Sequence, residues 1–350
     1  SYTNIAKHLI KNYHDQKILL VYDKNINKKI MNYFIHDLKV SFPKINLYLI
    51  QGQKLNKNTK GLFKLLDVFF DKKFTKRSIV VSCGGGVVGD ICGLASSLYL
   101  RGLLHYHIPT TMTAIIDSCI GGKTGINHKG IINSLGTYYH PERVYISRNI
   151  LQLIPQREYI AGIPEIIKCG LIRKSNIFSL LNRKKEVLNR NFSLISKMIR
   201  LALETKIKFF SEDVYEQNKR LNLNLGHTFA HAMEMTLKSD NKPDIIRHGE
   251  AVGIGILCEI YYAKGKNKEF QTVKKLLKTY NLPTDLKAYI KKKSFKKMKK
   301  EIYKNIFLDK KTISKYPRYI KVSKIGKTKV AEMKNFALIR KTINEVIFSL

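Results

Sequence analysis

The sequence predicts an α/β protein, with a Rossmann-like, mostly parallel sheet domain at the N-terminus and a mainly α-helical C-terminal domain. Up to about residue 150, short β-branched runs alternate with stretches of helical spacing. This alternation is typical of a parallel sheet with helices on both faces. From about Gln156, long stretches with apolar residues at helical spacing replace the β-branched runs. The 350 residues fit about two domains, and a hydrophobic content of 44% is enough for a sizeable core.

Five short apolar runs are the predicted strands of the first domain. Such brief β-branched runs, closed by turn residues, are expected of buried parallel strands, and they cover residues 17–22, 46–50, 78–82, 104–108 and 143–146. A helix is predicted from about Asp90 to Leu100. Further helices are predicted over residues 162–172, 195–210, 226–237 and 249–263. The change of pattern near Pro155 predicts two domains, residues 1–155 and 156–350.

The net charge of +38 is extreme and would normally indicate a nucleic-acid partner. The lysines, however, are spread along the whole chain and accompany many Asn, Ile and Tyr residues. That pattern fits the codon bias of an AT-rich genome, and even the dense lysine run over 291–300 resembles a solvated helical face. We therefore expect no nucleic-acid partner. An acidic phosphorylated substrate would need only a few of these lysines.

Membrane and disulfide-rich classes do not fit the chain. The apolar stretch 79–100 contains the glycine run 84–86, Gly89 and Asp90, so we do not expect it to span a membrane. No signal peptide is visible at the start. The five cysteines are scattered, odd in number and without Cys-x-x-Cys spacing, which indicates reduced thiols. We expect a cytoplasmic protein with no membrane partner.

A histidine-rich stretch carries the strongest chemical signal. His227 and His231 are four residues apart and Glu234 follows three residues later, so at helical spacing all three lie near one face. His248 comes later in the chain and Glu165 earlier. Imidazoles and a carboxylate from separate elements are the ligands of a catalytic zinc ion, with one position left for substrate. For the two spaced histidines alone, a helix with satisfied histidines remains the alternative.

A glycine-rich turn follows the third predicted strand and precedes a predicted helix. It runs from Cys83 through three glycines to Gly89 and Asp90. Glycine lets backbone N–H groups approach a pyrophosphate, and the N-terminus of a helix favours negative charge. The run departs from the usual G-x-G-x-x-G spacing, so a plain strand–helix turn remains an alternative to a dinucleotide site.

Six short blocks follow one another within a stretch that runs from about Asp23 to Lys311. They are the glycine run, Pro-Thr-Thr, Asp-Ser-x-x-Gly-Gly-Lys, Glu-x-x-Lys, Leu-Asn-Leu-Gly-His-Thr and His-Gly-Glu-Ala-Val, at residues 84–90, 109–111, 117–123, 165–168, 223–228 and 248–252. In order and spacing they resemble the 3-dehydroquinate synthase family, the NAD- and zinc-dependent sugar phosphate cyclases of the shikimate pathway. Each block alone is modest, whereas the joint pattern is highly specific.

The resemblance implies roles for individual positions. The metal ligands, for Zn²⁺ or Co²⁺, match Glu165, His227 and His248, and His231 would handle protons and substrate instead. The substrate positions match Lys123, Lys168, Lys206, Arg220, Asn224, Arg101, Asp117, Asn133, Lys310 and Lys311. The NAD positions match Asp23, Gly86, Val87, Val88, Gly89, Asp90, Thr110, Thr111 and Lys123. Taken singly, Lys206 or Arg220 would more often be a surface residue, and Lys168 a plain i,i+3 partner of Glu165.

Three positions depart from the family pattern, and all are on the cofactor side. Gln53 stands where an acid usually holds a ribose hydroxyl, Ile132 where a lysine is usual, and Leu153 where a threonine is common. The metal and substrate residues look complete. We therefore expect weaker NAD binding rather than lost chemistry.

The resemblance implies conversion of 3-deoxy-D-arabino-heptulosonate 7-phosphate, a phosphorylated sugar acid, into 3-dehydroquinate and phosphate. This is a phosphorus–oxygen lyase reaction of aromatic amino acid biosynthesis, in which NAD is regenerated within each turnover. The family also suggests a homodimer. A related sugar phosphate cyclase, a metal-dependent alcohol dehydrogenase that releases NADH, and a non-enzymatic nucleic-acid binder remain the alternatives.

Overall fold

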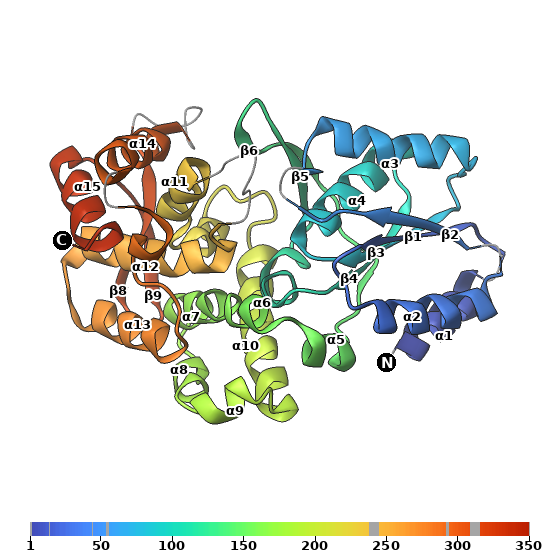
Figure 1. Cartoon of the computed structure of the whole chain (residues 1–350), viewed down its shortest axis with the longest axis horizontal. Helices are drawn as coiled ribbons and strands as arrows, with labels where there is room; N and C mark the ends of the chain where they lie inside the picture. Colours follow the sequence, from blue (N-terminus) through green and yellow to red (C-terminus); the bar gives the residue numbers. More distant parts are fainter. Residues whose placement is uncertain are drawn as a thin grey trace. The chain divides into compact units, whose positions relative to one another are not determined.

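The computed structural model describes residues 2–13, 15–43, 45–53, 56–237, 245–291, 294–308 and 316–349. The chain forms two compact units, Ser1–Tyr159 and Ile160–Leu350. Figure 1 shows the first unit in blue to green and the second in green to red.

A five-stranded parallel sheet forms the centre of the N-terminal unit and confirms the predicted α/β class. Its strands run in the order β2-β1-β3-β4-β7 and every neighbouring pair is parallel. Their bounds are β1 (Ile18–Asp23), β2 (Asn46–Ile50), β3 (Ile79–Gly84), β4 (Leu104–Pro109) and β7 (Arg143–Val144). The five predicted strands are thus present, although β7 is shorter than expected. Strand β3 is buried along its whole length, which explains the β-branched run Ile79-Val80-Val81 at its start.

Helices cover both faces of this sheet. Figure 1 shows α3 (Thr59–Asp71) and α4 (Gly86–Leu98) on one face, with α1 (Tyr2–Tyr13) and α2 (Lys28–Ser41) on the other. Two short helices, α5 (Arg148–Leu153) and α6 (Gln156–Ile160), end the unit. Buried residues of α3 and α4, among them Phe69 and Ile91, form one hydrophobic cluster with β1 and β3.

Helix α4 begins earlier than predicted. Its first residue is Gly86 and Gly85 is its N-cap, whereas the sequence predicts the helix from about Asp90. The glycine run therefore connects the end of β3, at Gly84, directly to the first residue of the helix, with no loop between them. The backbone N–H groups of the first turn of α4 lie at the positive end of the helix dipole.

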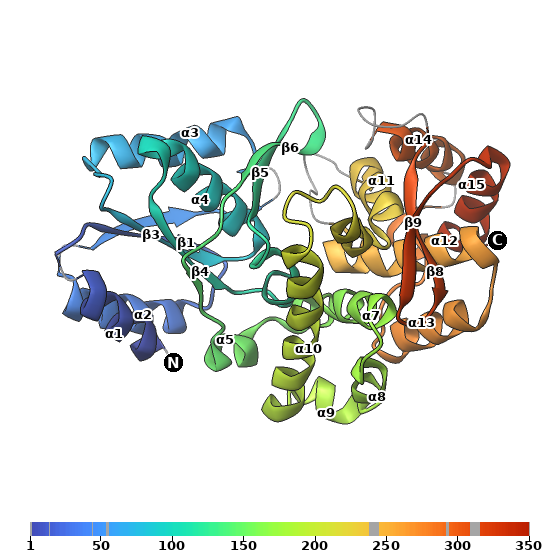
Figure 2. The same ribbon diagram turned by 180° about the vertical axis from the view of Figure 1, so that it is seen from behind.

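Two antiparallel hairpins were absent from the sequence prediction. In the N-terminal unit, β5 (Lys123–His128) pairs with β6 (Ile131–Tyr138). In the C-terminal unit, β8 (Arg318–Lys324) pairs with β9 (Lys327–Glu332). Figure 2 shows β8 and β9 in front of α12.

The C-terminal unit is mainly helical, as predicted. Its α-helices are α7 (Ile163–Ile172), α8 (Ile177–Leu181), α9 (Lys184–Leu188), α10 (Phe192–Ser211), α11 (His227–Leu237), α12 (His248–Lys264), α13 (Lys268–Thr279), α14 (Phe295–Leu308) and α15 (Phe336–Thr342). Short helical turns complete it: η4 (Lys219–Asn224), η5 (Lys287–Tyr289) and η7 (Ile343–Ile347). The four predicted helices correspond to α7, α10, α11 and α12.

Glycines let the central helix α12 approach its neighbours through the backbone. A Cβ atom added to Gly255 would lie 2.0 Å from the carbonyl oxygen of Gly226, and one added to Gly249 would lie 1.7 Å from that of Ala161. Both contacts are backbone to backbone, so no other residue fits. The first contact holds the start of α11 against the middle of α12, and the second holds the start of α12 against the residues that precede α7.

Within the described ranges, no helix combines the length and apolar character that crossing a bilayer requires.

Candidate active site

Three helix starts in the C-terminal unit bring two histidines and a glutamate together. Glu165 comes from the first turn of α7, and His227 and His248 are the first residues of α11 and α12. One ligand-type atom from each lies within 4.8 Å of the other two. Glu165 Oε1 is 3.6 Å from His248 Nε2 and 3.9 Å from His227 Nε2. This is the donor set of a divalent metal site with three protein ligands.

The state of Glu165 fits a bound cation. Its side chain is fully buried, and Oε1 has no hydrogen-bond donor within the part of the chain that the structure describes. Oε2 lies 2.5 Å from Lys168 Nζ. The two groups form an ion pair, but the angles at the atoms do not fit a hydrogen bond. A buried carboxylate oxygen without a partner is costly. A divalent ion between Oε1 and the two imidazoles would remove that cost.

The outer ring nitrogens of both histidines are already engaged. His227 Nδ1 lies 3.2 Å from the carbonyl oxygen of Leu225, and His248 Nδ1 lies 3.3 Å from each carboxylate oxygen of Glu234. If each Nδ1 donates its proton there, each Nε2 keeps a lone pair for a metal. Metal-binding histidines usually show this outer arrangement. The sequence placed Glu234 near the right helix face without showing that it reaches His248.

His231 lies beside this group without belonging to it. Its ring centroid is 5.5 Å from that of His227 and 6.2 Å from that of His248. The histidine that the spacing made a tempting ligand is therefore a neighbour of the three ligand-type residues. Its role in proton handling stays a prediction.

Three of the predicted cations of this unit are buried. Lys168, Lys206 and Arg220 are exposed by only 2%, 7% and 1%, so the alternative of an ordinary surface residue is wrong for Lys206 and Arg220. The alternative for Lys168, an i,i+3 ion pair with Glu165, is present in the structure. The Arg220 guanidinium donates to the carbonyl oxygen of Val214 at 2.5 Å and lies 5.0 Å from the Phe210 ring centroid. Buried cations of this kind suit an anionic ligand.

The predicted nucleotide residues of the N-terminal unit lie around the start of α4. A Cβ on Gly85 would be 3.1 Å from Thr111 Cγ2, and one on Gly86 would be 3.0 Å from Ser118 Oγ. The Thr110 N–H donates to the carbonyl oxygen of Gly84 at 3.0 Å. The glycine turn, residues 84–86, and the threonine pair, Thr110 and Thr111, therefore form one surface at the N-terminus of α4. Phosphate groups bind readily at such a helix N-terminus.

Asp23 marks the end of β1 beside a second close approach. A Cβ on Gly52 would lie 2.1 Å from Asp23 Oδ2, and Asp23 Oδ1 accepts the Asn25 N–H at 3.0 Å. Two of the residues that depart from the family pattern differ in burial. Gln53 is half-buried, whereas Leu153 is 49% exposed.

Lys57 is a site residue that sequence reasoning missed. Its ammonium group contacts the side-chain oxygens of both Asp90 and Asn133, and the residue is only 8% exposed. It thereby joins a predicted NAD position to a predicted substrate position. No local pattern marks Lys57, because its partners lie 33 and 76 residues away in the sequence.

One predicted substrate residue, Arg101, lies apart from the start of α4. Arg101 is exposed and lies in η2 (Tyr99–Arg101), beyond the C-terminal end of α4. At 1.5 Å per residue, α4 places it roughly 20 Å from the glycine turn. Lys310, with its neighbour Lys311, lies outside the described residues.

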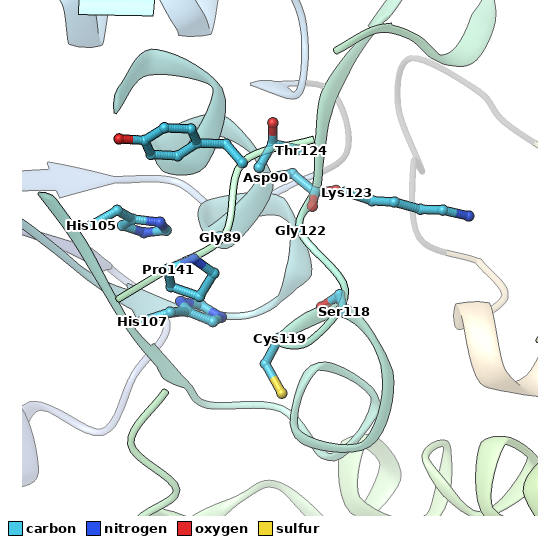
Figure 3. Close-up of a pocket in the computed structure, with 11 residues that line it drawn as sticks. Gly89, Asp90, His105, His107, Ser118, Cys119, Gly122, Lys123, Thr124 and Pro141 are labelled. Carbon is cyan, nitrogen blue, oxygen red and sulfur yellow. The ribbon is translucent and has the colours of Figure 1, made fainter. Parts of the chain in front are cut away.

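A small pocket of the N-terminal unit contains a buried histidine pair (Figure 3). It is lined by Gly89, Asp90, His105, His107, Ser118, Cys119, Gly122, Lys123, Thr124, Tyr139 and Pro141. The Ser82 hydroxyl lies between the two rings, 2.7 Å from His105 Nε2 and 2.8 Å from His107 Nδ1. Burial lowers the pKa of His105 to about 3 and that of His107 to about 4. Both are therefore neutral at pH 7.

This histidine pair should make the protein sensitive to acid. In the unfolded chain a histidine has its ordinary pKa near 6.5, so below that pH the unfolded state binds more protons than the folded state. The free energy of unfolding is therefore unaffected by these two histidines above about pH 7. It decreases as the pH falls from about 6.5 towards 4 and 3, because protons bind to the unfolded state. Each histidine should cost on the order of 1.4 kcal/mol per pH unit in that window. We expect urea midpoints between pH 7 and pH 5 to fall less for His105→Phe than for the native chain. An identical pH dependence would contradict this assignment.

Solved structures share the fold over nearly the whole chain. 2-Deoxy-scyllo-inosose synthase, complexed with carbaglucose-6-phosphate, NAD+ and Co2+, aligns with a TM-score of 0.82 at 22% identity, covering 99% of this chain and 95% of that one. A probable glycerol dehydrogenase from Sinorhizobium meliloti 1021 aligns with a TM-score of 0.63 at 14% identity, covering 98% and 93%. The fold is thus one that sugar phosphate cyclases and dehydrogenases share.

Sequence comparison narrows this class to one family. Residues 47–161 match the family model for the 3-dehydroquinate synthase N-terminal part, and residues 162–312 match that for the C-terminal part. The 3-dehydroquinate synthase of Prochlorococcus marinus (strain MIT 9312) is 36% identical over 292 residues, covering 81% of this chain and 79% of that protein. That of Sulfurimonas denitrificans is 32% identical over 344 residues, covering 95% and 91%. The chain belongs to the 3-dehydroquinate synthase family.

Proposed function

We propose that this enzyme converts 3-deoxy-D-arabino-heptulosonate 7-phosphate into 3-dehydroquinate and phosphate, the lyase step of aromatic amino acid biosynthesis that its family carries out. The observation that carries the proposal is the convergence of Glu165, His227 and His248 beside the buried Lys168. A phosphorylated sugar acid needs both a metal for its hydroxyl groups and cations for its anionic groups.

The C-terminal domain, residues 156–350, would bind metal and substrate. Glu165, His227 and His248 would hold Zn²⁺ or Co²⁺, and such an ion polarises the hydroxyl groups bound to it. Lys168, Lys206 and Arg220 would bind and orient the anionic groups of the substrate. His231, next to the metal ligands, would hold or release a proton.

The N-terminal domain, residues 1–155, would bind NAD. The first turn of α4, Gly86 to Asp90, would receive the pyrophosphate, and Thr110 and Thr111 would lie along the same surface. NAD supplies reversible hydride transfer when bound. Asp23 and Lys123 complete the set of proposed cofactor residues, and Asp117 and Asn133 the substrate residues of this domain.

Catalysis should release phosphate without net NADH. Incubating the metal-loaded protein with the heptulosonate phosphate and NAD+ should release one phosphate per substrate molecule, measured with a colorimetric assay. The NADH absorbance should stay near its starting value. The matched control is the same sugar acid without its phosphate group, which should release nothing. Stoichiometric NADH with either compound would instead support the alcohol dehydrogenase alternative, whose relatives share the fold.

The cofactor pocket should bind NAD more weakly than a typical family member. Ile132 has no ammonium group to offer a phosphate, and a hydrogen bond to a charged group typically contributes about 1.5–3 kcal/mol. Changing Ile132→Lys should therefore tighten NAD binding about tenfold or more, measured by calorimetric titration. Ile132→Gln is the matched control, since it places a polar side chain at the same position without a positive charge. Tight native binding that Ile132→Lys leaves unchanged would refute the idea.

We also propose that the protein is a cytoplasmic homodimer without a nucleic-acid partner. Strand β6 pairs only with β5 among the described strands and exposes Ile131, Leu135 and Tyr138 by 48%, 42% and 39%. An exposed strand edge with apolar side chains is a natural place for a second copy. All five cysteines are buried and none forms a disulfide, which suits a reducing compartment. Sedimentation equilibrium gives the oligomeric state directly.

A further inference from the structure

A surface loop connects α10 to η4 and leads directly into two proposed substrate residues. Most of residues 212–219 are exposed, whereas Arg220, the next residue, is 1% exposed. Within the loop only Asp213 and Glu216 are half-buried. An exposed loop of this kind has little packing to fix its shape, so polar contacts must do so.

Asp213 supplies those contacts. Its Oδ1 accepts the N–H of Gln217 at 2.9 Å, and its Oδ2 accepts the N–H groups of Asn218 and Arg220 at 2.7 and 3.0 Å. Burial alone would raise the pKa of Asp213, but the three backbone N–H groups and the Arg220 charge outweigh it and lower that pKa. The side chain is therefore an ionised acceptor, and such bonds are stronger than neutral ones.

The loop that Asp213 closes in turn fixes two side chains. The carbonyl oxygen of Val214 accepts a hydrogen bond from Arg220 Nη1 at 2.5 Å. Glu216 Oε1 accepts one from Asn224 Nδ2 at 2.8 Å, and Glu216 holds a left-handed φ of +57°. A non-glycine residue keeps that conformation only where its surroundings enforce it. Both Arg220 and Asn224 thus depend on the loop for their orientation.

We propose that Asp213 is a positioning residue for binding of the anionic substrate. Its carboxylate gathers the backbone of residues 217–220, so that the Arg220 guanidinium and the Asn224 amide are held in place before a phosphorylated acid arrives. Preorganisation of this kind reduces the ordering that binding would otherwise require. The inference rests on the proposed function, because it takes Arg220 and Asn224 as substrate residues.

The test compares Asp213→Asn with Glu212→Gln in the metal-loaded protein. Asparagine has the same shape, but only one of its two terminal atoms is an acceptor, so in either orientation its NH2 group faces at least one of the three backbone N–H donors. Glu212 is the matched control, since this neighbouring acid forms an exposed ion pair with Lys219 at 2.7 Å. Asp213→Ala extends the series if it folds with a native thermal midpoint.

Asp213→Asn should raise the KM for the heptulosonate phosphate about tenfold or more, with a smaller change in kcat. Zinc affinity, NAD affinity and the thermal midpoint should stay close to native, and Glu212→Gln should match the native protein throughout. A native KM in Asp213→Asn, or a parallel loss of zinc binding, overturns the positioning role while the proposed function stands. A native protein that releases no phosphate overturns both.

Discussion

Replacing His227 by alanine should remove the bound metal and lower kcat/KM at least about a thousandfold. The variant keeps only Glu165 and His248 of the three ligand-type residues, and metal polarisation contributes several kcal/mol to such reactions. It should also leave Glu165 Oε1, which has no hydrogen-bond donor among the described residues, with one imidazole fewer nearby. Metal content after dialysis, measured by atomic emission, and phosphate release are the readouts.

His231→Ala is the matched control for that result. Its ring lies beside the ligand group but outside it, so the variant should keep its metal and still lose turnover. If His227→Ala retains one metal ion with native affinity, or if His231→Ala loses the metal, the ligand assignment is wrong.

Replacing Gly255 by alanine should destabilise the C-terminal unit and weaken metal binding at the same time. The new Cβ would lie 2.0 Å from the Gly226 carbonyl oxygen and 3.2 Å from the Ala230 nitrogen. Neither atom can turn away as a side chain could, so α11 and α12 must separate, and His227 moves with α11. Overpacking of this kind costs about 3 kcal/mol, which corresponds to a fall in the thermal midpoint of about 6 °C or more.

Gly253→Ala, on the same helix, separates this effect from a general loss of glycine. Its Cβ would meet side-chain atoms of Leu277 at 3.0 Å and of Pro164 at 3.3 Å, and the leucine can shift slightly. We expect a change of less than about 1.5 kcal/mol and native zinc affinity. Stability is measured by circular dichroism and zinc affinity by titration. Equal losses of both in Gly255→Ala and Gly253→Ala would contradict the close-contact explanation.

The fold could be predicted where local pattern and packing agree. The buried strands β1, β3 and β4 are covered on both faces, so their sequences are continuous apolar runs and were recognised. The hairpin β5–β6 was missed because β5 contains polar residues and glycine and β6 is largely exposed. Strands β8 and β9 alternate lysine with β-branched residues over part of their length, and this period-2 pattern is short and lies among many other lysines.

The site residues that could be predicted from the sequence are those that lie within the short sequence blocks. Residues within one block, such as His227 and Asn224, share a local pattern. The bridge from Lys57 to Asp90 and Asn133, and the bonds of Ser82 to His105 and His107, join segments that no local pattern connects. The burial of Arg220 could not be predicted from the sequence either, because it depends on the conformation of the loop before it and not on the spacing of residues along the chain.

The bare-backbone contact between α11 and α12 has an evolutionary consequence. Where Gly226 meets Gly255, the separation of the two helices is set by peptide atoms that every protein shares, and no particular apolar side chain controls it. Mutational drift can then exchange leucine for isoleucine in the surrounding core, and fill the outer surface with lysine, without changing the spacing of His227 and His248. A lineage under strong pressure on base composition could therefore reach a charge of +38 and still inherit the geometry of its metal centre.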